Sequence, residues 1–250
     1  MCRMLAYSGP PVTLSRLILE PSHSLLKQSY APRYQSVGTV NADGFGVGWY
    51  DLAASSEPGV YRNDKPIWSD HSFSSIARVI SSGAIVAAVR DATPPGPVEV
   101  SSTAPFAAGT LLFAHNGALN GFFDGVNIEI RSMLSRNRGS QIRGSSDSEV
   151  LFAFVLDRID EGASQADALR ATIKACSRWG GRFNFLLHDG NGITATASGN
   201  SLFATKAAAT IAEGTIIASE PLDDSAGWES IEDGYLVEAS AGGFDVTELD

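Results

Sequence analysis

Runs and alternations of apolar residues divide the chain into strands, helices and turns. Residues 2–7 (Cys-Arg-Met-Leu-Ala-Tyr) predict a short strand, which Gly9-Pro10-Pro11 ends. Two uninterrupted apolar runs, residues 84–89 and 110–114, are typical of strands that are covered on both faces. We therefore expect both runs to be buried strands.

Helical spacing of apolar residues marks four further segments. In residues 70–81 apolar side chains stand at i, i+3, i+4 and i+7, which predicts an amphipathic helix. The longest helical pattern covers residues 148–161, and a second one covers residues 165–178. Residues 127–137 are a weaker candidate for a helix.

The last third of the chain has the short alternating runs of strands. The runs cover residues 183–188, 192–197, 202–205, 215–219, 235–238 and 244–249. Asp189-Gly190-Asn191-Gly192 is a typical hairpin turn between the first two. Strands at both ends of the chain, with helices between them, favour an α+β fold in which two sheets lie between two helical layers.

A glycine-spaced strand is expected after the turn at residues 41–44. Gly44, Gly46 and Gly48 fall on one face of this strand because side chains alternate between the faces. A face without side chains lets another backbone or a ligand come close. Plain tight packing explains the pattern equally well, and it is not a phosphate loop, because no Gly-Lys-Ser helix start follows.

Composition and charge narrow the function classes. The chain has 250 residues, 44% of them hydrophobic and 18% charged, and a formal net charge of −10. This acidic balance disfavours nucleic acid and anionic membranes as partners. Neither a signal sequence nor a membrane-spanning stretch is apparent, and two cysteines form no disulfide framework or metal cluster. We expect a cytoplasmic protein of one domain.

Cys2 is the first candidate for chemistry. If the initiator Met1 is removed, Cys2 carries both a thiol and a free α-amine whose pKa is near ~7.7–8.0. An amine of this basicity can accept the thiol proton directly or through a water, which makes the thiol a nucleophile. The alternative is that Cys2 is an ordinary buried residue of the first strand.

Polar residues follow both buried strands and precede the longest helix. Arg90 ends the first strand, and a buried arginine needs a partner such as a carboxylate from the protein or a ligand. His115-Asn116-Gly117 follows the second strand, where an amide side chain and a glycine N–H suit an oxyanion site. Ser146 or Asp147 can cap the helix. Structural roles alone remain possible for each.

The order of these motifs resembles the class II glutamine amidotransferases, a family of N-terminal-nucleophile hydrolases. The resemblance covers residues 2 to about 160 and implies a single type-2 amidotransferase domain over residues 2–250. It also implies the four-layer αββα sandwich of mainly antiparallel sheets, and no metal or organic cofactor. The motifs are, in chain order, Cys2, Asn41-Ala42-Asp43-Gly44, Arg90-Asp91-Ala92-Thr93, His115-Asn116-Gly117 and Ser146-Asp147-Ser148-Glu149.

The resemblance assigns a role to each matching residue. Cys2 matches the nucleophile, and Asn116 with the Gly117 N–H matches the oxyanion hole. Arg90 matches the residue that binds the α-carboxylate of a glutamyl group, and Asp147 the residue that binds its α-ammonium. Two further residues are counted with the substrate-binding group, namely Thr93, which matches a pocket position, and His115.

This sequence differs from the glutamine-using members. They often read Arg-Trp-Ala-Thr-His-Gly where this chain has Arg90-Asp91-Ala92-Thr93-Pro94-Pro95-Gly96. Without the Trp and the His, the pocket is expected to accept a larger group on the γ-nitrogen. Residues 25–33, 89–94, 104–106 and 218–224 are similar to free-standing amidohydrolases of ergothioneine biosynthesis, which release glutamate from a γ-glutamyl sulfoxide conjugate.

A small γ-glutamyl molecule is thus the expected partner, and its leaving amine would be a trimethylated histidine derivative. Aromatic or acidic side chains suit such a cation, and Tyr30 and Trp228 are candidates on residue type alone. Three alternatives remain: a glutaminase that meets a separate synthase, an amidohydrolase of another γ-glutamyl compound, and a binding module without catalysis. No synthase sequence follows residue 250.

Overall fold

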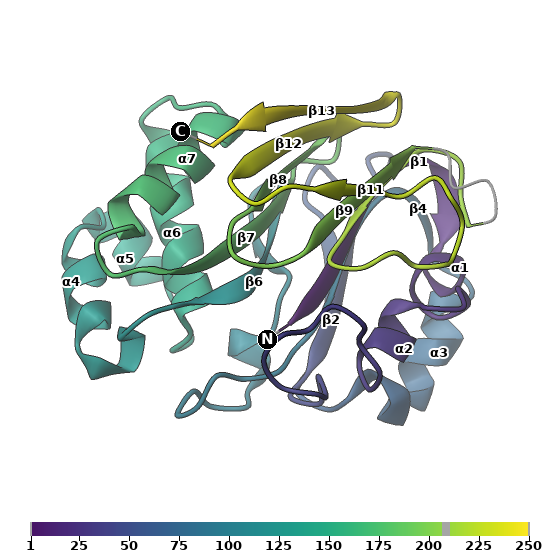
Figure 1. The fold of residues 1–250 in the computed structure, drawn as a ribbon, viewed down its shortest axis with the longest axis horizontal. Helices are drawn as coiled ribbons and strands as arrows, with labels where there is room; N and C mark the ends of the chain where they lie inside the picture. Colours follow the sequence, from purple (N-terminus) through teal and green to yellow (C-terminus); the bar gives the residue numbers. More distant parts are fainter. Residues whose placement is uncertain (1, 207–210, 250) are drawn as a thin grey trace.

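The computed structural model describes residues 2–206 and 211–249. Met1, whose removal would free the α-amine of Cys2, lies outside these residues. Its strands form two antiparallel sheets (Figure 1). The seven-stranded sheet has the order β11-β9-β10-β1-β4-β2-β3 and the six-stranded sheet the order β13-β12-β8-β7-β6-β5. The strands are β1 (Arg3–Thr13), β2 (Phe45–Trp49), β3 (Gly59–Asn63), β4 (Ser81–Val89), β5 (Phe106–Ala108), β6 (Leu111–Leu119), β7 (Gly181–His188), β8 (Ile193–Ala197), β9 (Leu202–Lys206), β10 (Thr215–Ala218), β11 (Glu229–Ile231), β12 (Tyr235–Ser240) and β13 (Gly243–Glu248).

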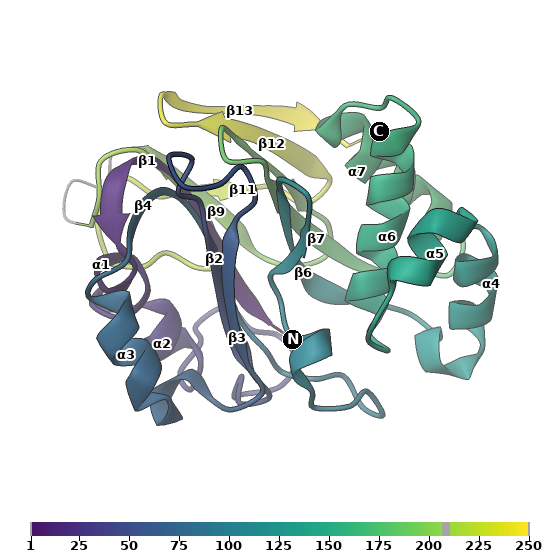
Figure 2. The same ribbon diagram turned by 180° about the vertical axis from the view of Figure 1, so that it is seen from behind.

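Helices cover the outer face of each sheet, as the views from both sides show (Figures 1 and 2). The seven-stranded sheet is covered by α1 (Leu14–Ile18), α2 (Leu25–Gln28) and α3 (His71–Ala77). The six-stranded sheet is covered by α4 (Val126–Ser132), α6 (Asp147–Asp160) and α7 (Gln165–Cys176), and α5 (Arg136–Gln141) packs against α6. Short 3-10 turns lie at Ile67–Ser69, Val100–Ser102 and Phe122–Asp124. The predicted four-layer α+β sandwich is confirmed.

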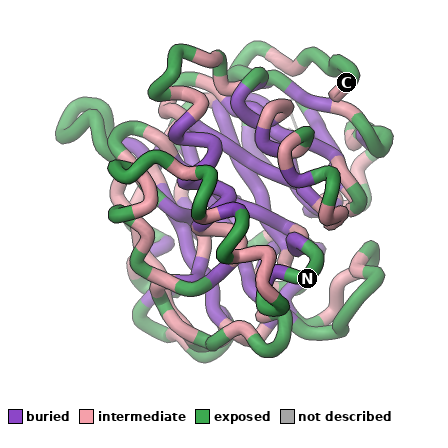
Figure 3. The backbone as a smooth tube through the Cα atoms, turned by 90° about the vertical axis from the view of Figure 1, so that its left-hand side faces the viewer, coloured by how far each residue is buried: buried purple, intermediate pink, exposed green. Residues whose placement is uncertain are grey.

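Three apolar cores hold these layers together. Leu17, Phe45 and Phe73 belong to the core between the first helical layer and its sheet. A second core lies between the sheets, and a third between the six-stranded sheet and α6 and α7. Buried residues accordingly follow the strands of both sheets (Figure 3). Burial of this apolar area is the main stabilising contribution.

A polar junction also links the two sheets. The Nε2–H of His188 on β7 donates to the carbonyl of Tyr7 on β1 at 3.1 Å, and its Nδ1 accepts from the Gly190 N–H at 3.0 Å. At the same junction, the Tyr50 hydroxyl donates to the His188 carbonyl at 2.6 Å. Burial lowers the pKa of His188 to about 4, so the ring is neutral at pH 7.

The glycines of β2 behave as their spacing predicts. A Cβ at position 46 would lie 2.3 Å from the carbonyl oxygen of Ala104, and one at position 48 would lie 2.6 Å from a methyl group of Leu112. The close approach of the backbone after β4 therefore requires glycine at Gly46, whereas a Cβ at position 48 would meet the end of a leucine side chain. Packing, rather than a ligand, occupies this face.

Several predicted boundaries were wrong. β1 continues past Gly9-Pro10-Pro11 to Thr13, with an irregular register between Ser8 and Val12 that accommodates the prolines. α3 ends at Ala77, because Ser81 already pairs with Thr13 in the sheet. The segment 127–137 forms two helices, and Ser135 caps the second.

Candidate active site

One cavity of about 270 Å³ brings together residues that are far apart in the sequence. It lies beside the start of β1, where the chain begins in Figure 1. Its wall consists of Cys2, residues 90–97, residues 117–124, residues 146–148 and Arg182. Ends of both sheets and the first turn of α6 thus meet around the first cysteine.

The strand register places Cys2 beside Arg90. β1 and β4 are antiparallel neighbours, and Arg3 pairs with Val89. The next residue in each direction, Cys2 and Arg90, therefore leaves the sheet at the same edge. Cys2 is half-buried, so its thiol remains accessible from the cavity.

Arg90 is buried but has no acidic partner. Its Nη2 donates to the Pro97 carbonyl at 3.0 Å and its Nη1 to the Asp43 carbonyl at 3.4 Å. Within residues 2–206 and 211–249, no carboxylate forms an ion pair with its guanidinium group. A buried arginine that faces a cavity in this state favours binding of an anion, and a carboxylate fits it best.

Asp43 fixes the loop that carries Arg90. Its carboxylate accepts the Ala92 N–H at 2.8 Å, and its own N–H donates to the Arg90 carbonyl at 2.9 Å. Gly44 has a φ of 127° and a Cβ there would lie 2.8 Å from the Thr103 hydroxyl, so only glycine fits. The Asn41-Ala42-Asp43-Gly44 turn thus positions the arginine.

Asn116 and Gly117 lie within β6, whereas the sequence placed them after a strand. The strand continues to Leu119 because His115, Asn116 and Gly117 pair with residues of β7. Alternation turns the Asn116 side chain toward the space between the sheets, where its Nδ2 lies 3.5 Å from the Ser219 hydroxyl. Such a long contact leaves the amide available as a donor.

Gly117 is required by its surroundings. A Cβ at this position would lie 1.8 Å from the Arg182 carbonyl oxygen and 2.3 Å from Nε2 of His115. The neighbouring strand therefore comes closer than any side chain permits. Gly117 lines the cavity and Asn116 does not, so the amide of Asn116 lies behind this part of the wall.

Asp147 projects from the first turn of α6 into the cavity wall. Its Oδ2 accepts the Leu119 N–H at 2.8 Å and its Oδ1 accepts the Ser148 N–H at 2.8 Å. The N-terminus of the helix also favours a carboxylate. The side chain is half-buried and held in one orientation, as a group that binds an ammonium requires.

His115 lies behind the wall, with both ring nitrogens bonded to the protein. Nε2 donates to the Arg182 carbonyl at 2.9 Å, and Nδ1 lies 3.0 Å from the Ser148 hydroxyl. Burial lowers the pKa of His115, although nearby Asp147 opposes the shift, so the ring is neutral at pH 7. His115 thereby orients Arg182 and Ser148, which do line the cavity.

Comparison with known proteins agrees with this geometry. The family model described as "Glutamine amidotransferases class-II" matches residues 1–249. This chain is a class II glutamine amidotransferase family member.

Two curated relatives of this family member share a name, gamma-glutamyl-hercynylcysteine sulfoxide hydrolase. The protein from Mycobacterium tuberculosis is 38% identical over all of this chain and 97% of its own length. The one from Mycolicibacterium smegmatis is 37% identical over the full length of both. A solved class II domain protein from Silicibacter pomeroyi has a TM-score of 0.71 and 26% identity, and the alignment covers 99% of both chains.

Sequence reasoning about this family member identified part of the cavity wall and missed what supports it. Cys2, Arg90, Thr93, Gly117 and Asp147 all line the cavity. The residues missed are Arg182, which also lines the cavity, and two residues next to Asn116, namely Ser219 and Asn200. The Asn200 Nδ2 donates to the Asn116 carbonyl at 2.8 Å. Their contacts depend on strand pairing, which no local sequence signal indicates.

Neither aromatic residue suggested for the leaving group lines the cavity. Tyr30 packs edge-on against Trp68, and Trp228 donates to Asp223 at 3.0 Å. The aromatic residues in the wall are Phe122 and Phe123, next to Asp124. Over the residues that the structure describes, no helix is long and apolar enough to cross a membrane, and no group of three or more potential metal ligands is found.

Proposed function

We propose that this protein hydrolyses the γ-glutamyl amide bond of γ-glutamyl-hercynylcysteine sulfoxide and releases glutamate and hercynylcysteine sulfoxide. The observation that carries the proposal is the shared cavity of a half-buried Cys2, an Arg90 without an acidic partner and a fixed Asp147. A cation and an anion in the wall of one cavity match the two charges of a glutamyl group. The names of the full-length relatives support the substrate.

Removal of Met1 precedes catalysis and frees the α-amine of Cys2. The amine takes the thiol proton, and sulfur attacks the γ-carbonyl carbon. Asn116 Nδ2 and the Gly117 N–H stabilise the resulting oxyanion, as neutral donors in a water-poor site do. Arg90 binds the α-carboxylate and Asp147 the α-ammonium, while Thr93 lines the pocket beside them.

The C–N bond then breaks as the amine product takes the proton from the Cys2 ammonium. Water attacks the remaining thioester, the Cys2 amine accepts the water proton, and the C–S bond breaks with return of the proton to sulfur. Atoms and charges balance without a metal or an organic cofactor. His115 contributes through the orientation of Ser148 and Arg182.

We further propose that residues 2–250 form one amidotransferase domain and that the enzyme acts in the cytoplasm. The acidic side chain Asp124 and the rings of Phe122 and Phe123 form the part of the wall best suited to a cationic leaving amine. Asp91 and Pro94 stand where glutamine-using members often have Trp and His, and this difference leaves room for the larger group.

Intact mass and glutamate release test the proposal together. The purified protein is weighed, then incubated separately with the γ-glutamyl sulfoxide and with glutamine. Loss of Met1 with glutamate release from the sulfoxide alone supports the proposal. Comparable release of glutamate from glutamine indicates a glutaminase with a separate synthase. If Met1 has been removed and neither compound is hydrolysed, the enzyme assignment is refuted.

A further inference from the structure

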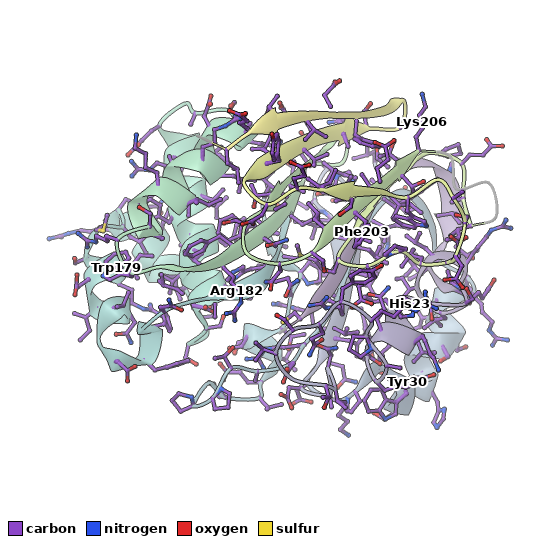
Figure 4. The ribbon with its side chains drawn as sticks, viewed as in Figure 1. His23, Tyr30, Trp179, Arg182, Phe203 and Lys206 are labelled. Carbon is purple, nitrogen blue, oxygen red and sulfur yellow. The ribbon has the colours of Figure 1, made fainter. Side chains whose placement is uncertain are left out.

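A buried ionic cluster lies behind Cys2, outside the cavity. Arg3 and Glu220 are completely buried and His23 is 2% exposed. The Arg3 Nη1 donates to Glu220 Oε1 at 3.1 Å, and the His23 Nε2 lies 2.7 Å from Glu220 Oε2. His23 lies on the side of α1 and α2, as Figure 4 shows. None of the three lines the cavity.

Arg3 also holds the main chain of the residue before it. Its Nε donates to the Cys2 carbonyl at 2.7 Å, whereas a different nitrogen, Nη1, contacts Glu220. A planar guanidinium with fixed donor directions joins these two acceptors in one geometry, which a lysine ammonium cannot reproduce. Burial lowers the pKa of Arg3, although Glu220 opposes the shift, and the group remains charged.

Glu220 connects this cluster to the loop after α2. Its Oε1 also accepts the Tyr34 N–H at 3.0 Å, and its Oε2 accepts the Arg33 N–H at 2.8 Å. Burial raises the pKa of Glu220, but the hydrogen bonds from His23 and these amides, together with the Arg3 charge, hold it below its usual value. The carboxylate is therefore ionised and fully bonded.

Stability alone does not explain these charges. A buried ion pair costs several kcal/mol per ion in desolvation, and apolar residues of similar volume often serve as well. A fixed orientation is what such a pair supplies best, and here it acts on the nucleophile's own peptide group. Displacing a reacting group by about 1 Å can cost about 10²-fold in rate.

We propose that Arg3 is a positioning residue for catalysis, which fixes the Cys2 main chain, and hence its thiol and amine, against the Asn116–Gly117 pair. Glu220 and His23 hold the guanidinium in place, and Glu220 ties this position to the segment at residues 33–34. The inference rests on the proposed role of Cys2 as nucleophile. Arg3 itself touches neither substrate nor the reacting atoms.

The test compares the Arg3→Lys variant with the unaltered protein. Lysine keeps the charge beside Glu220 but loses the rigid link to the Cys2 carbonyl. We expect kcat to fall roughly 10–100-fold with KM within about twofold, and the melting temperature to change little. Glu220→Gln, which removes the charge at constant shape, should shift kcat in the same direction if Arg3→Lys does not fold.

The matched control is Arg138→Lys on α5. Its Nε and Nη2 donate to the Asp160 carboxylate at 2.7 Å each, so the same chemical change occurs at an arginine that does not line the cavity. This variant should keep the kcat of the unaltered enzyme. The proposal is overturned if Arg3→Lys has the kcat of the unaltered enzyme. It is also overturned if the fall in kcat is no larger than the fraction of unfolded protein accounts for.

A measurement without substrate separates this inference from the proposed function. The rate of Cys2 alkylation by iodoacetamide at pH 7 reports how the amine acts on the thiol, with Cys2→Ala as the blank. We expect Arg3→Lys to slow alkylation about threefold or more. If no amide is hydrolysed yet alkylation slows, the proposed function fails while the positioning stands; equal alkylation rates in both proteins refute the positioning.

Discussion

The two sheets contribute to the cavity in different ways. The seven-stranded sheet supplies reactive or charged groups, Cys2 and Arg90, at the ends of paired strands. The six-stranded sheet supplies neutral groups from inside β6, with Gly117 in the cavity wall and Asn116 behind it. Groups at strand ends keep solvent access and freedom to bind, whereas groups inside a strand are fixed by pairing before any substrate arrives. In the reaction proposed above, the nucleophile and the anion-binding group thus come from one sheet and the oxyanion donors from the other.

Replacement of the nucleophile gives the largest expected effect. Cys2→Ala removes the only thiol in the cavity wall that the structure describes, so glutamate release should fall by roughly 10³–10⁶-fold. Cys176→Ala is the control, because burial raises the pKa of that thiol to about 12 and it lies in the helical core. If Cys2→Ala released glutamate at the rate of the unaltered enzyme, the nucleophile would not come from the seven-stranded sheet.

Gly117→Ala tests the backbone of the other sheet. The new methyl would collide with the Arg182 carbonyl, so we expect the free energy of unfolding to fall by about 4 kcal/mol or more, with loss of activity. Gly139→Ala on α5, whose nearest atom would be 4.0 Å away, should instead stabilise by about 0.5–1 kcal/mol. Denaturant unfolding measures both, and equal stability of the two variants would contradict the close approach of β6 and β7.

Asn116→Ala removes the amide donor while the strand remains. If Nδ2 stabilises the oxyanion, kcat should fall roughly 10²–10³-fold and KM should change little. Ser219→Ala removes the 3.5 Å contact to Asn116 and the 3.1 Å hydrogen bond from the Met4 N–H but keeps the Asn116 amide, so we expect kcat to stay within a few-fold. A rise in KM in place of the fall in kcat would assign Asn116 to ground-state binding.

Arg90→Gln addresses recognition by the seven-stranded sheet. The variant keeps polar length but loses the charge, so KM for a γ-glutamyl amide should rise roughly 10²-fold. An amide that lacks the α-carboxylate should bind both proteins equally weakly, which makes the effect specific to that group. An equal loss with both substrates would show that Arg90 acts through folding of its loop.

Acid weakens the junction between the sheets. Because burial lowers the pKa of His188 from 6.5 to about 4, the unfolded chain binds a proton that the folded one does not. Stability is complete above pH 6.5 and falls as the pH drops toward 4, by about 2 kcal/mol between pH 7 and pH 5. His188→Gln should flatten this slope in thermal unfolding, and an unchanged slope would assign the proton uptake to other groups, including His115.

Apolar patterns predicted the layers because they are local signals, and the family resemblance identified five residues of the cavity wall. Uninterrupted apolar runs mark most of β4 and the first four residues of β6, and the motifs at Arg90 and Asp147 follow or precede predicted elements. The extent of β6 was not predictable in this way. His115-Asn116-Gly117 reads as a polar turn, yet pairing with β7 keeps it extended.

Contacts between distant segments could likewise not be predicted from the sequence. Ser219 meets Asn116, and Glu220 meets Arg3, across more than a hundred residues of chain. The stretch at residues 218–224 was singled out for its likeness to relatives, but only the folded chain shows that its glutamate supports the first cysteine. Side-chain chemistry is local, whereas the partner that orients it is not.

The position of Cys2 at the head of β1 limits how the protein can be produced. Any affinity tag fused ahead of Cys2 would occupy the cavity entrance and acylate the amine that the proposed reaction uses. The end of β13 lies beside α7, in the upper part of the view of Figure 1, whereas the chain begins in the lower part. A purification tag or an immobilisation linker therefore belongs at the carboxyl terminus, and an amino-terminal one has to be cut off directly before the cysteine.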